Sequence, residues 1–172
     1  MILDFSQNKI NMVFEITEQN TVALKDFSFK GKEIEKNLKY CSIADVHLCG
    51  ENPNDHHGAK HTGTSGSISL KYKSHNQYEN EFGNKIEFNL CDDKMEVVVH
   101  YQFYNGISAL RAWTTVTNIA KENIGLEYVS SFAYTGLEDD ISIFMPHSTW
   151  CREVNWREYT LNDLGFNRLN SF

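Results

Sequence analysis

The residues best suited to chemistry lie in one short histidine-rich segment. Asp55, His56, His57, Lys60 and His61 fall within seven consecutive positions. Their carboxylate, imidazole and ammonium groups donate and accept hydrogen bonds, as the recognition of a hydroxyl-rich ligand requires. We therefore interpret these five residues as substrate-binding residues. A polar loop without any ligand is the alternative that the same composition allows.

The same segment could also be considered as a metal site. His57 and His61 are four positions apart, a spacing that places two imidazoles on one face of a helix, and Asp55 could be a third ligand. Gly58 and the turn-forming residues around it disfavour a helix here. The four cysteines are scattered singly, without the paired spacing of a zinc site. The sequence therefore predicts neither a metal nor a cofactor.

Acidic pairs could serve a glycosidase, which places two carboxylates on either side of the bond that it cleaves. The two pairs in this sequence, Asp92-Asp93 and Asp139-Asp140, are immediate neighbours, so their side chains point apart. Both pairs occur in contexts typical of turns. No catalytic residue is predicted.

The three tryptophans allow two interpretations each. Trp113, in the segment RAWT, could be a platform for a sugar ring, but a core position is favoured for a side chain of this size. Trp150 and Trp156 could likewise contact a ligand. We expect them instead to form an apolar anchor that docks the C-terminal segment or a neighbouring domain.

The elements that must position these residues are β-strands. Apolar residues alternate with polar ones over long stretches, as in half-buried strands, and Asn105-Gly106 and residues 91–94 are typical turns. The clearest inward-facing sets are Met12, Phe14 and Ile16; Ile86, Phe88 and Leu90; and Met95, Val97, Val99, Tyr101 and Phe103. The pattern predicts an all-β fold, an antiparallel β-sandwich with one face of each sheet open to water.

The less regular stretches give further expectations. Alternation of Ile68, Leu70 and Tyr72 predicts a strand, and further strands are expected over residues 107–119, 124–134 and 141–145. Residues 49–66 are expected to form a long loop. Pro146 is expected in a loop, and a short helix is expected around residues 161–164.

Length and charge limit the possible functions. The chain has 172 residues, which suits one domain, residues 1–172. Its net charge of −7 disfavours nucleic acid as a partner. No apolar run is long enough to span a membrane, and no secretion signal is visible at the N-terminus, so we expect no membrane association and a cytoplasmic protein.

Three stretches resemble the N-terminal domain of family 36 glycoside hydrolases, the bacterial α-galactosidases. They are residues 54–64 (NDHHGAKHTGT), residues 126–137 (LEYVSSFAYTGL), and residues 146–151 (PHSTWC) continuing through residues 156–161 (WREYTL). The RAWT segment is similar as well. The resemblance implies a β-supersandwich of the galactose-mutarotase-like type, of which this chain would be the first portion.

The resemblance also implies a division of labour. In that family both catalytic aspartates lie on a (β/α)₈ barrel that follows the sandwich, so this portion would support assembly and shape the substrate site of an enzyme that hydrolyses terminal α-galactosides with retention. Related enzymes are often tetramers in which a loop of this domain reaches a neighbouring subunit's site. Residues 55–61 are the candidate for that loop, and a homo-oligomer is expected. The alternative is a free-standing carbohydrate-binding or scaffold module.

Overall fold

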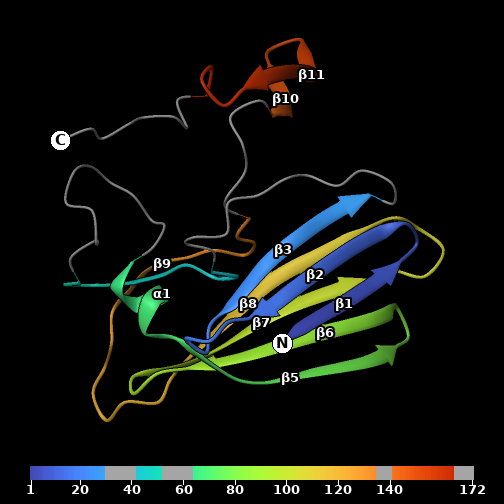
Figure 1. Ribbon diagram of the computed structural model, residues 1–172. Coiled ribbons are helices and arrows are strands. Elements are labelled where there is room, and N and C mark those ends of the chain that lie inside the picture. Colours follow the sequence, from blue (N-terminus) through green and yellow to red (C-terminus); the bar gives the residue numbers. More distant parts are fainter. Residues whose placement is uncertain (30–41, 52–63, 135–140, 165–172) are drawn as a thin grey trace. The chain divides into compact units, whose positions relative to one another are not determined.

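The computed structural model describes residues 1–29, 42–51, 64–134 and 141–164, and in these the protein is built almost entirely from β-strands (Figure 1). The one described helix, α1 (Ser65–Ser69), is a single short turn. The strands are β1 (Ile2–Gln7), β2 (Ile10–Ile16), β3 (Val22–Phe29), β4 (Val46–Leu48), β5 (Lys71–Asn80), β6 (Gly83–Cys91), β7 (Met95–Phe103), β8 (Leu110–Asn118), β9 (Leu126–Val129), β10 (Ser142–Thr149) and β11 (Arg152–Thr160). Within the described residues, no helix is long and apolar enough to cross a membrane.

The strands form four antiparallel sheets, with the orders β1-β2-β3, β5-β6-β7-β8, β4-β9 and β10-β11. The first three belong to a compact unit over Met1–Gly136. The β10–β11 hairpin belongs to a second unit, Leu137–Phe172.

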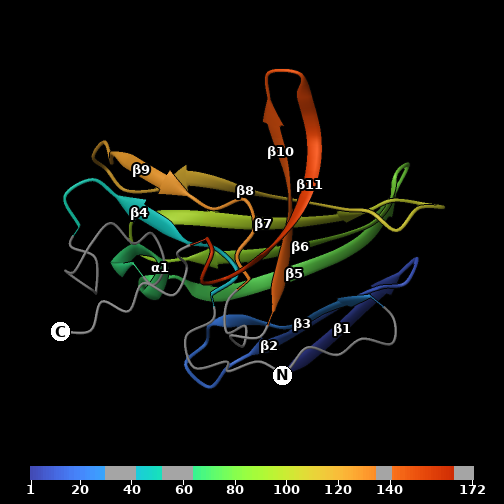
Figure 2. The same cartoon turned by 90° about the horizontal axis from the view of Figure 1, so that it is seen from above.

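Within the first unit, the three-stranded sheet packs face to face on the four-stranded sheet (Figure 2). Phe14 of β2 meets Phe88 of β6 with ring centroids 4.6 Å apart, and it meets Tyr101 of β7 at 5.2 Å. All three side chains are fully buried. Since each buried aromatic ring of this size removes roughly 150–250 Å² from water, this contact between the layers is a main source of stability. The predicted antiparallel sandwich is confirmed.

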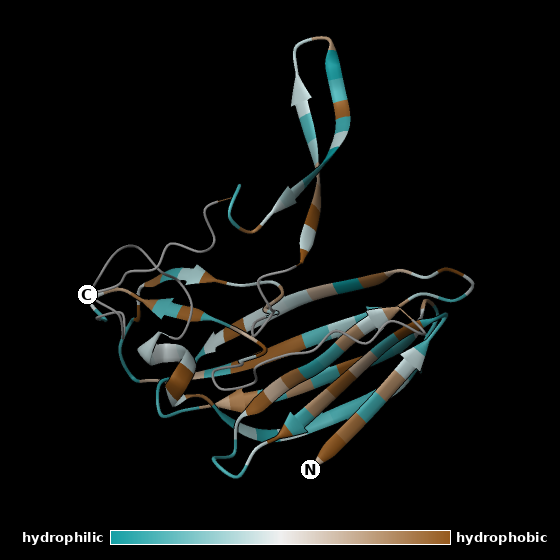
Figure 3. Ribbon diagram, turned by 45° about the horizontal axis from the view of Figure 1, so that its top comes forward, coloured by the Kyte–Doolittle hydropathy of each residue, from teal (hydrophilic) through white to brown (hydrophobic). Residues whose placement is uncertain are grey.

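The two-residue alternation explains why these strands form two layers. The predicted inward sets of β2, β6 and β7 are all buried in one continuous core, and their neighbours along each strand face outward. Figure 3 shows the resulting banding of apolar and polar residues along the strands. The predicted turn over residues 91–94 is also present, because Asp92 Oδ1 accepts hydrogen bonds from the backbone N–H groups of Lys94 and Met95.

Several predicted boundaries were wrong. The alternation from Ile68 to Tyr72 does not form one strand: Ser65–Ser69 is helical and β5 begins only at Lys71. Thr64 caps this helix, since its hydroxyl accepts a hydrogen bond from the Ser67 N–H. A Thr cap favours a helix start over an extended chain.

The strand expected over residues 107–119 is shorter, Leu110–Asn118, and the one expected over residues 124–134 is reduced to Leu126–Val129. Pro146 lies inside β10 rather than in a loop. It is tolerated because β10 has a strand on one side only, so the missing N–H can face away from the ladder. Residues 161–164 form turns, not a helix.

One end of the sandwich is fastened by amide side chains. Asn8, in the β1–β2 turn, donates hydrogen bonds to the carbonyl oxygens of Tyr104 and Ile107 in the β7–β8 loop. Gln7 beside it donates to Asn105 Oδ1 and accepts from the Asn84 N–H. These bonds join residues 77 to 99 positions apart in sequence, and so they fix the two sheets relative to each other.

Candidate functional site

A group of polar and aromatic side chains gathers on the face of the four-stranded sheet that points away from the sandwich core. We call Tyr78, Lys85, Glu87, His100 and Trp113 the Trp113 cluster. Lys85 and Glu87 alternate with core residues of β6 and therefore face outward. The register then brings the others beside them: Lys85 pairs with Tyr78, Glu87 with His100, and His100 with Trp113.

The charged members are unusually well covered for a sheet face. The side chains of Lys85, Glu87 and His100 are only 14%, 18% and 12% exposed. Charged groups this deeply placed need partners, because an unpaired charge removed from water is costly. The partners lie within the cluster.

Glu87 is the centre of the hydrogen-bond network. Its Oε1 atom lies 2.7 Å from Lys85 Nζ and 2.9 Å from His100 Nδ1, and it accepts a hydrogen bond from the Tyr78 hydroxyl at 3.2 Å. All three contacts fall on Oε1. Oε2 of Glu87 has no hydrogen-bond partner among the residues that the structure describes, so it can accept a hydrogen bond from a ligand hydroxyl.

These contacts set the charge of the cluster. Burial alone would raise the pKa of Glu87, but the hydrogen bonds from Lys85 and His100 outweigh it and lower the pKa. Burial opposes charge on Lys85 as well, yet the hydrogen bonds to Glu87 and Tyr78 raise its pKa. For His100 burial dominates and lowers the pKa. At neutral pH the cluster thus holds a lysine cation, a glutamate anion and a neutral histidine.

The hydrogen bonds also fix the tautomer of His100. Because the Glu87 carboxylate can only accept, Nδ1 carries the proton and donates a hydrogen bond to it. Nε2 of the neutral ring then accepts a hydrogen bond from the Thr115 hydroxyl at 3.1 Å. Held in this way, the imidazole lies flat against Trp113, with ring centroids 4.6 Å apart and planes 9° from parallel. Lys85 Nζ lies 4.8 Å from the Trp113 ring centroid, a cation–π distance. The aromatic surface is therefore rigid before any ligand arrives.

Arg111 extends the cluster towards solvent. Its guanidinium lies 5.2 Å from the Trp113 ring centroid and has no hydrogen-bond partner among the described residues. Its N–H donors, the free oxygen of Glu87 and the indole together offer donors, an acceptor and an apolar ring within one small area. Hydroxyl-bearing rings are recognised by this combination of groups.

The core interpretation of Trp113 was wrong. The residue is half-buried on the outer face and is not a member of the apolar core. The sequence carried a signal for this, since Trp113 is in phase with Arg111 and Thr115. The residues of β8 that pack against the core have the opposite phase: Leu110, Ala112 and Val116. The polar partners on β6 and β7 could not be found from β8 alone.

The predicted substrate-binding residues, Asp55, His56, His57, Lys60 and His61, lie outside the described residues. The chain on either side of them is described. The Glu51 N–H donates to the Leu48 carbonyl, and the Thr64 hydroxyl donates to the Val46 carbonyl. Leu48 and Val46 both belong to β4. The described residues that flank the segment, Glu51 and Thr64, are therefore both hydrogen-bonded to this strand.

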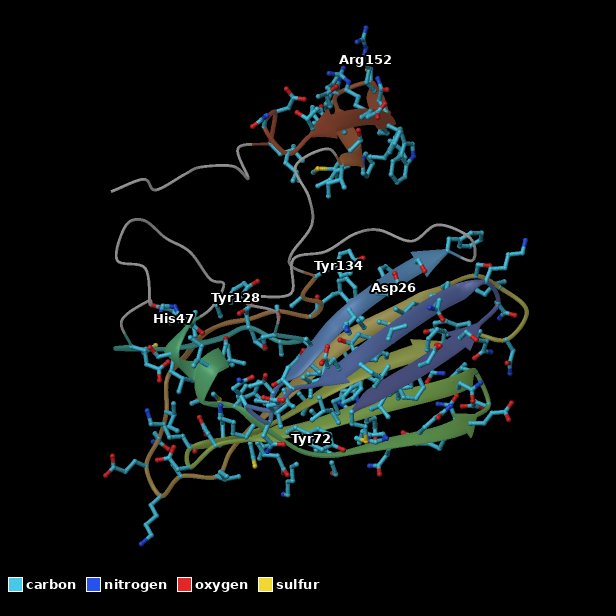
Figure 4. The ribbon with its side chains drawn as sticks, viewed as in Figure 1. Asp26, His47, Tyr72, Tyr128, Tyr134 and Arg152 are labelled. Carbon is cyan, nitrogen blue, oxygen red and sulfur yellow. The ribbon has the colours of Figure 1, made fainter. Side chains whose placement is uncertain are left out.

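His47 and Glu127 form an ion pair at this point. His47, on β4, lies beside β9, where Tyr128 is its partner in the register (Figure 4). His47 Nδ1 is 3.0 Å from Glu127 Oε2, and its Nε2 is 3.2 Å from the Glu51 carbonyl oxygen. Sequence analysis did not find this contact, because it depends on the pairing of β4 with β9, two strands that are far apart in the sequence.

The remaining candidates belong to other segments of the chain. Trp150 and Trp156 lie on the β10–β11 hairpin and are exposed, and the role of an anchor stays a prediction. Asp139 and Asp140 are outside the described residues. In the part of the chain that is described, no three His, Cys, Asp or Glu residues are arranged to hold a metal ion, and Cys49, Cys91 and Cys151 are free thiols.

Comparison with models of known protein families finds no match for this chain, and comparison with curated proteins finds none either. The geometry of the Trp113 cluster and the resemblance of the sequence stretches are therefore the basis for a function.

Proposed function

We propose that this chain is the N-terminal β-sandwich of an α-galactosidase-type glycoside hydrolase, and that it contributes sugar recognition and assembly, not bond cleavage. The parent enzyme hydrolyses terminal α-galactosides with retention. Two features support the proposal: the three sequence stretches that resemble this family, and an antiparallel sandwich of the kind that the resemblance implies.

The Trp113 cluster is the observation that carries the recognition role. Its rings are stacked and its charged groups are paired before binding, so little order has to be created when a sugar arrives. A pyranose ring can lie against the indole while its hydroxyl groups reach Arg111 and the free oxygen of Glu87. The ligand would be the galactoside of the parent enzyme.

The same geometry disfavours catalysis at this site. A retaining glycosidase needs a nucleophile and an acid/base, two carboxyl groups about 5–5.5 Å apart. The cluster contains a single carboxylate, Glu87, and three donors hold it ionised. A carboxylate stabilised in this way is a poor proton donor, and it has no second carboxylate in the cluster to act with.

A titration of the full chain with methyl α-galactoside, followed by NMR chemical shifts, tests the proposal. We expect shifts centred on β7 and β8 and at least about a tenfold loss of affinity in Trp113→Ala, equivalent to about 1.4 kcal/mol. Trp150→Ala removes an equally large side chain from the hairpin and should bind like the wild type. Equal affinity of the two variants, or no binding by the wild type, would overturn the recognition role.

A second measurement tests the absence of catalysis. The full chain incubated with a chromogenic α-galactoside is expected to release no chromophore above the uncatalysed rate. Hydrolysis that persists through repurification and is lost in Glu87→Gln would show that the chain is itself an enzyme.

A free-standing carbohydrate-binding module is the second candidate. It is favoured by the fact that every residue of the Trp113 cluster comes from β5 to β8, within the Met1–Gly136 unit. Both candidates predict sugar binding, and the gene separates them. An open reading frame that continues beyond Phe172 into a barrel domain supports the α-galactosidase, while a stop codon there supports the module.

A further inference from the structure

The β7–β8 loop carries an asparagine followed directly by a glycine, Asn105-Gly106, and both residues are exposed. An asparagine in this setting is open to an internal reaction, in which the backbone nitrogen of the next residue attacks the side-chain carbonyl carbon, Cγ. The product is a five-membered ring, and both reacting groups are already held in one molecule. A side chain on the following residue hinders the attack, and glycine has none.

The attacking nitrogen is accessible in this loop. Gly106 has φ +76°, and a Cβ atom built there would have no other atom within 4 Å, so this side of the peptide is uncrowded. Among the hydrogen bonds of the described residues, none uses the Gly106 N–H or the side-chain nitrogen Nδ2 of Asn105. Within this part of the chain, neither the nucleophile nor the leaving group has to break a hydrogen bond before it reacts.

The side-chain carbonyl group of Asn105, in contrast, is held in place. Gln7 Nε2 donates a hydrogen bond to Asn105 Oδ1, and Gln7 Oε1 in turn accepts one from the Asn84 N–H at 3.2 Å. Attack at Cγ moves negative charge onto Oδ1, so a donor that already points at this oxygen stabilises the charge as it develops. The distance from Gln7 Nε2 to Oδ1, 2.9 Å, lies within the range of about 2.7–3.1 Å that is typical of such donors.

We propose that Asn105 is a site of spontaneous deamidation in the folded protein, and that Gln7 accelerates the reaction. First, the Gly106 nitrogen bonds to Asn105 Cγ and loses its proton, the Cγ–Nδ2 bond breaks, and the side-chain amide leaves as ammonia. Water then opens the cyclic imide. Opening at Cγ gives aspartate, and opening at the main-chain carbonyl carbon gives isoaspartate, in which the backbone runs through the former side chain. Water is the only co-reactant, and the inference is independent of sugar recognition.

The two products differ in their effect on the end of the sandwich where the β1–β2 turn meets the β7–β8 loop (Figure 1). Asn8 Nδ2 donates to the carbonyl oxygens of Tyr104 and Ile107, which flank the reacting pair, at 2.6 and 3.0 Å. Isoaspartate adds one carbon atom to the backbone between these two carbonyl groups, so one amide no longer fits both. Aspartate leaves the backbone length unchanged and keeps an oxygen that can accept from Gln7. We therefore expect only isoaspartate to weaken this junction.

Peptide mapping of the full, folded chain tests the proposal. The tryptic peptide of residues 95–111 contains Asn105 as its sole asparagine. During incubation at mildly alkaline pH, where the Gly106 proton is removed more easily, we expect a growing fraction whose mass reflects replacement of NH₂ by OH. Isotopically labelled water should add one labelled oxygen, and a carboxyl methyltransferase specific for isoaspartate should modify part of the product.

Two other asparagines are internal controls for this experiment. Asn118 and Asn155 are exposed, but isoleucine and tryptophan follow them, so they should convert at least about tenfold more slowly than Asn105. Conversion of Asn105 at the rate of these controls would overturn the proposal. So would a folded chain that stays unchanged while the urea-unfolded chain converts, because the loop would then protect Asn105.

Gln7→Glu tests the accelerating role. Glutamate keeps an acceptor for the Asn84 N–H but has no proton to donate to Asn105 at this pH. We expect deamidation of the folded variant to be about two- to tenfold slower than in the wild type, the rate equivalent of one hydrogen bond. In urea the two chains should react equally fast, because residues 7 and 105 are no longer held together. An equal or faster rate in the folded variant would overturn the role of Gln7, and so would a difference that persists in urea.

Stability measurements test the difference between the products. The added negative charge allows ion exchange to separate deamidated chains from unchanged ones, and methylation identifies the isoaspartate fraction. We expect this fraction to unfold at a lower urea concentration than the fresh protein. Asn105→Asp, which is identical to the aspartate product, should unfold close to the wild type. An isoaspartate fraction as stable as the fresh protein would contradict the effect on the Asn8 junction.

Discussion

Tyr101 places a hydroxyl group in the middle of an otherwise apolar core. The side chain is fully buried against Phe14, Phe88 and Phe132, and among the described residues its oxygen has no hydrogen-bond partner. Burial raises the pKa of this hydroxyl far above its ordinary value, so it stays neutral. A buried polar group without a partner loses its bonds to water and gains nothing in return.

We therefore expect Tyr101→Phe to stabilise the protein, by about 1 kcal/mol in the free energy of unfolding. Urea denaturation measures the change. Tyr134→Phe is the matched control, because the Tyr134 hydroxyl donates to the Phe27 carbonyl oxygen and its removal should destabilise. If Tyr101→Phe lowers the stability instead, the hydroxyl has a partner, such as a buried water molecule.

His100 makes stability depend on pH in a defined window. The folded protein lowers the pKa of His100, chiefly through burial, with Glu87 and Lys85 of β6 beside the ring. The unfolded chain, with a histidine pKa near 6.5, therefore binds the proton more readily. Stability falls as pH drops through about 6.5 towards the folded pKa, and this contribution levels off below it.

Urea denaturation at several values between about pH 7.5 and 5 should show this loss, and His100→Gln should lose less stability over the same interval. Glu87 acts in a different window. Because its pKa is lowered, its contribution is present above the ordinary carboxyl pKa and is lost as pH falls through the folded value. Identical slopes for the wild type and His100→Gln would contradict the burial of a neutral imidazole.

At the level of elements, the turn between β5 and β6 depends on a close approach to a neighbouring chain segment. Gly83 has φ +144°, and a Cβ atom placed there would lie 2.7 Å from the Phe103 carbonyl oxygen. Gly106, in the β7–β8 loop, has φ +76° with no neighbouring atom within 4 Å of such a Cβ. A comparison of alanine substitutions at the two positions therefore distinguishes the cost of backbone strain from the cost of steric overlap.

Gly106→Ala is expected to cost about 1 kcal/mol, the price of a left-handed backbone for alanine. Gly83→Ala adds a clash with fixed backbone, so we expect roughly 2–4 kcal/mol. Thermal or urea unfolding of both variants makes the comparison. Equal losses would mean that the β5–β6 turn moves freely away from Phe103.

Elements with strong alternation could be predicted from the sequence, since a period of two residues fixes which side chains face the core. The inward sets of β2, β6 and β7 are such cases. The helix at Ser65–Ser69 could not be predicted in this way, because a single turn buries too few residues to establish a helical period. Its signal was the capping residue Thr64.

The candidate site was predictable only in part. The outward phase of Trp113 could be inferred from β8, but its contact with His100 depends on the register between β7 and β8 and on Glu87 of a third strand. Register is decided by packing between strands, which local patterns do not report. For the same reason the pairing of His47 with Glu127 was not anticipated.

At the scale of the whole molecule, the chain separates into a sandwich with a continuous core and a hairpin unit in which none of the residues described, 141–164, belongs to that core. The Trp113 cluster lies in the sandwich, and the exposed side chains of Trp150 and Trp156 lie on the hairpin. Because sugar recognition is proposed for the sandwich, variants of the hairpin can be used as its controls.

The hydrogen bonds from Gln7 and Asn8 to the β7–β8 loop can form only after that loop has been synthesised, and this delay has a consequence for folding on the ribosome. The first three strands leave the ribosome long before the sheet that covers them, since β3 ends at Phe29 and β7 ends at Phe103, 74 residues later. At a synthesis rate of about 5–20 residues per second, the apolar face of β1 to β3 stays uncovered for roughly 4–15 s. A nascent polypeptide in that condition is a client for a chaperone, and slowing translation after β3 should lengthen its dependence on one.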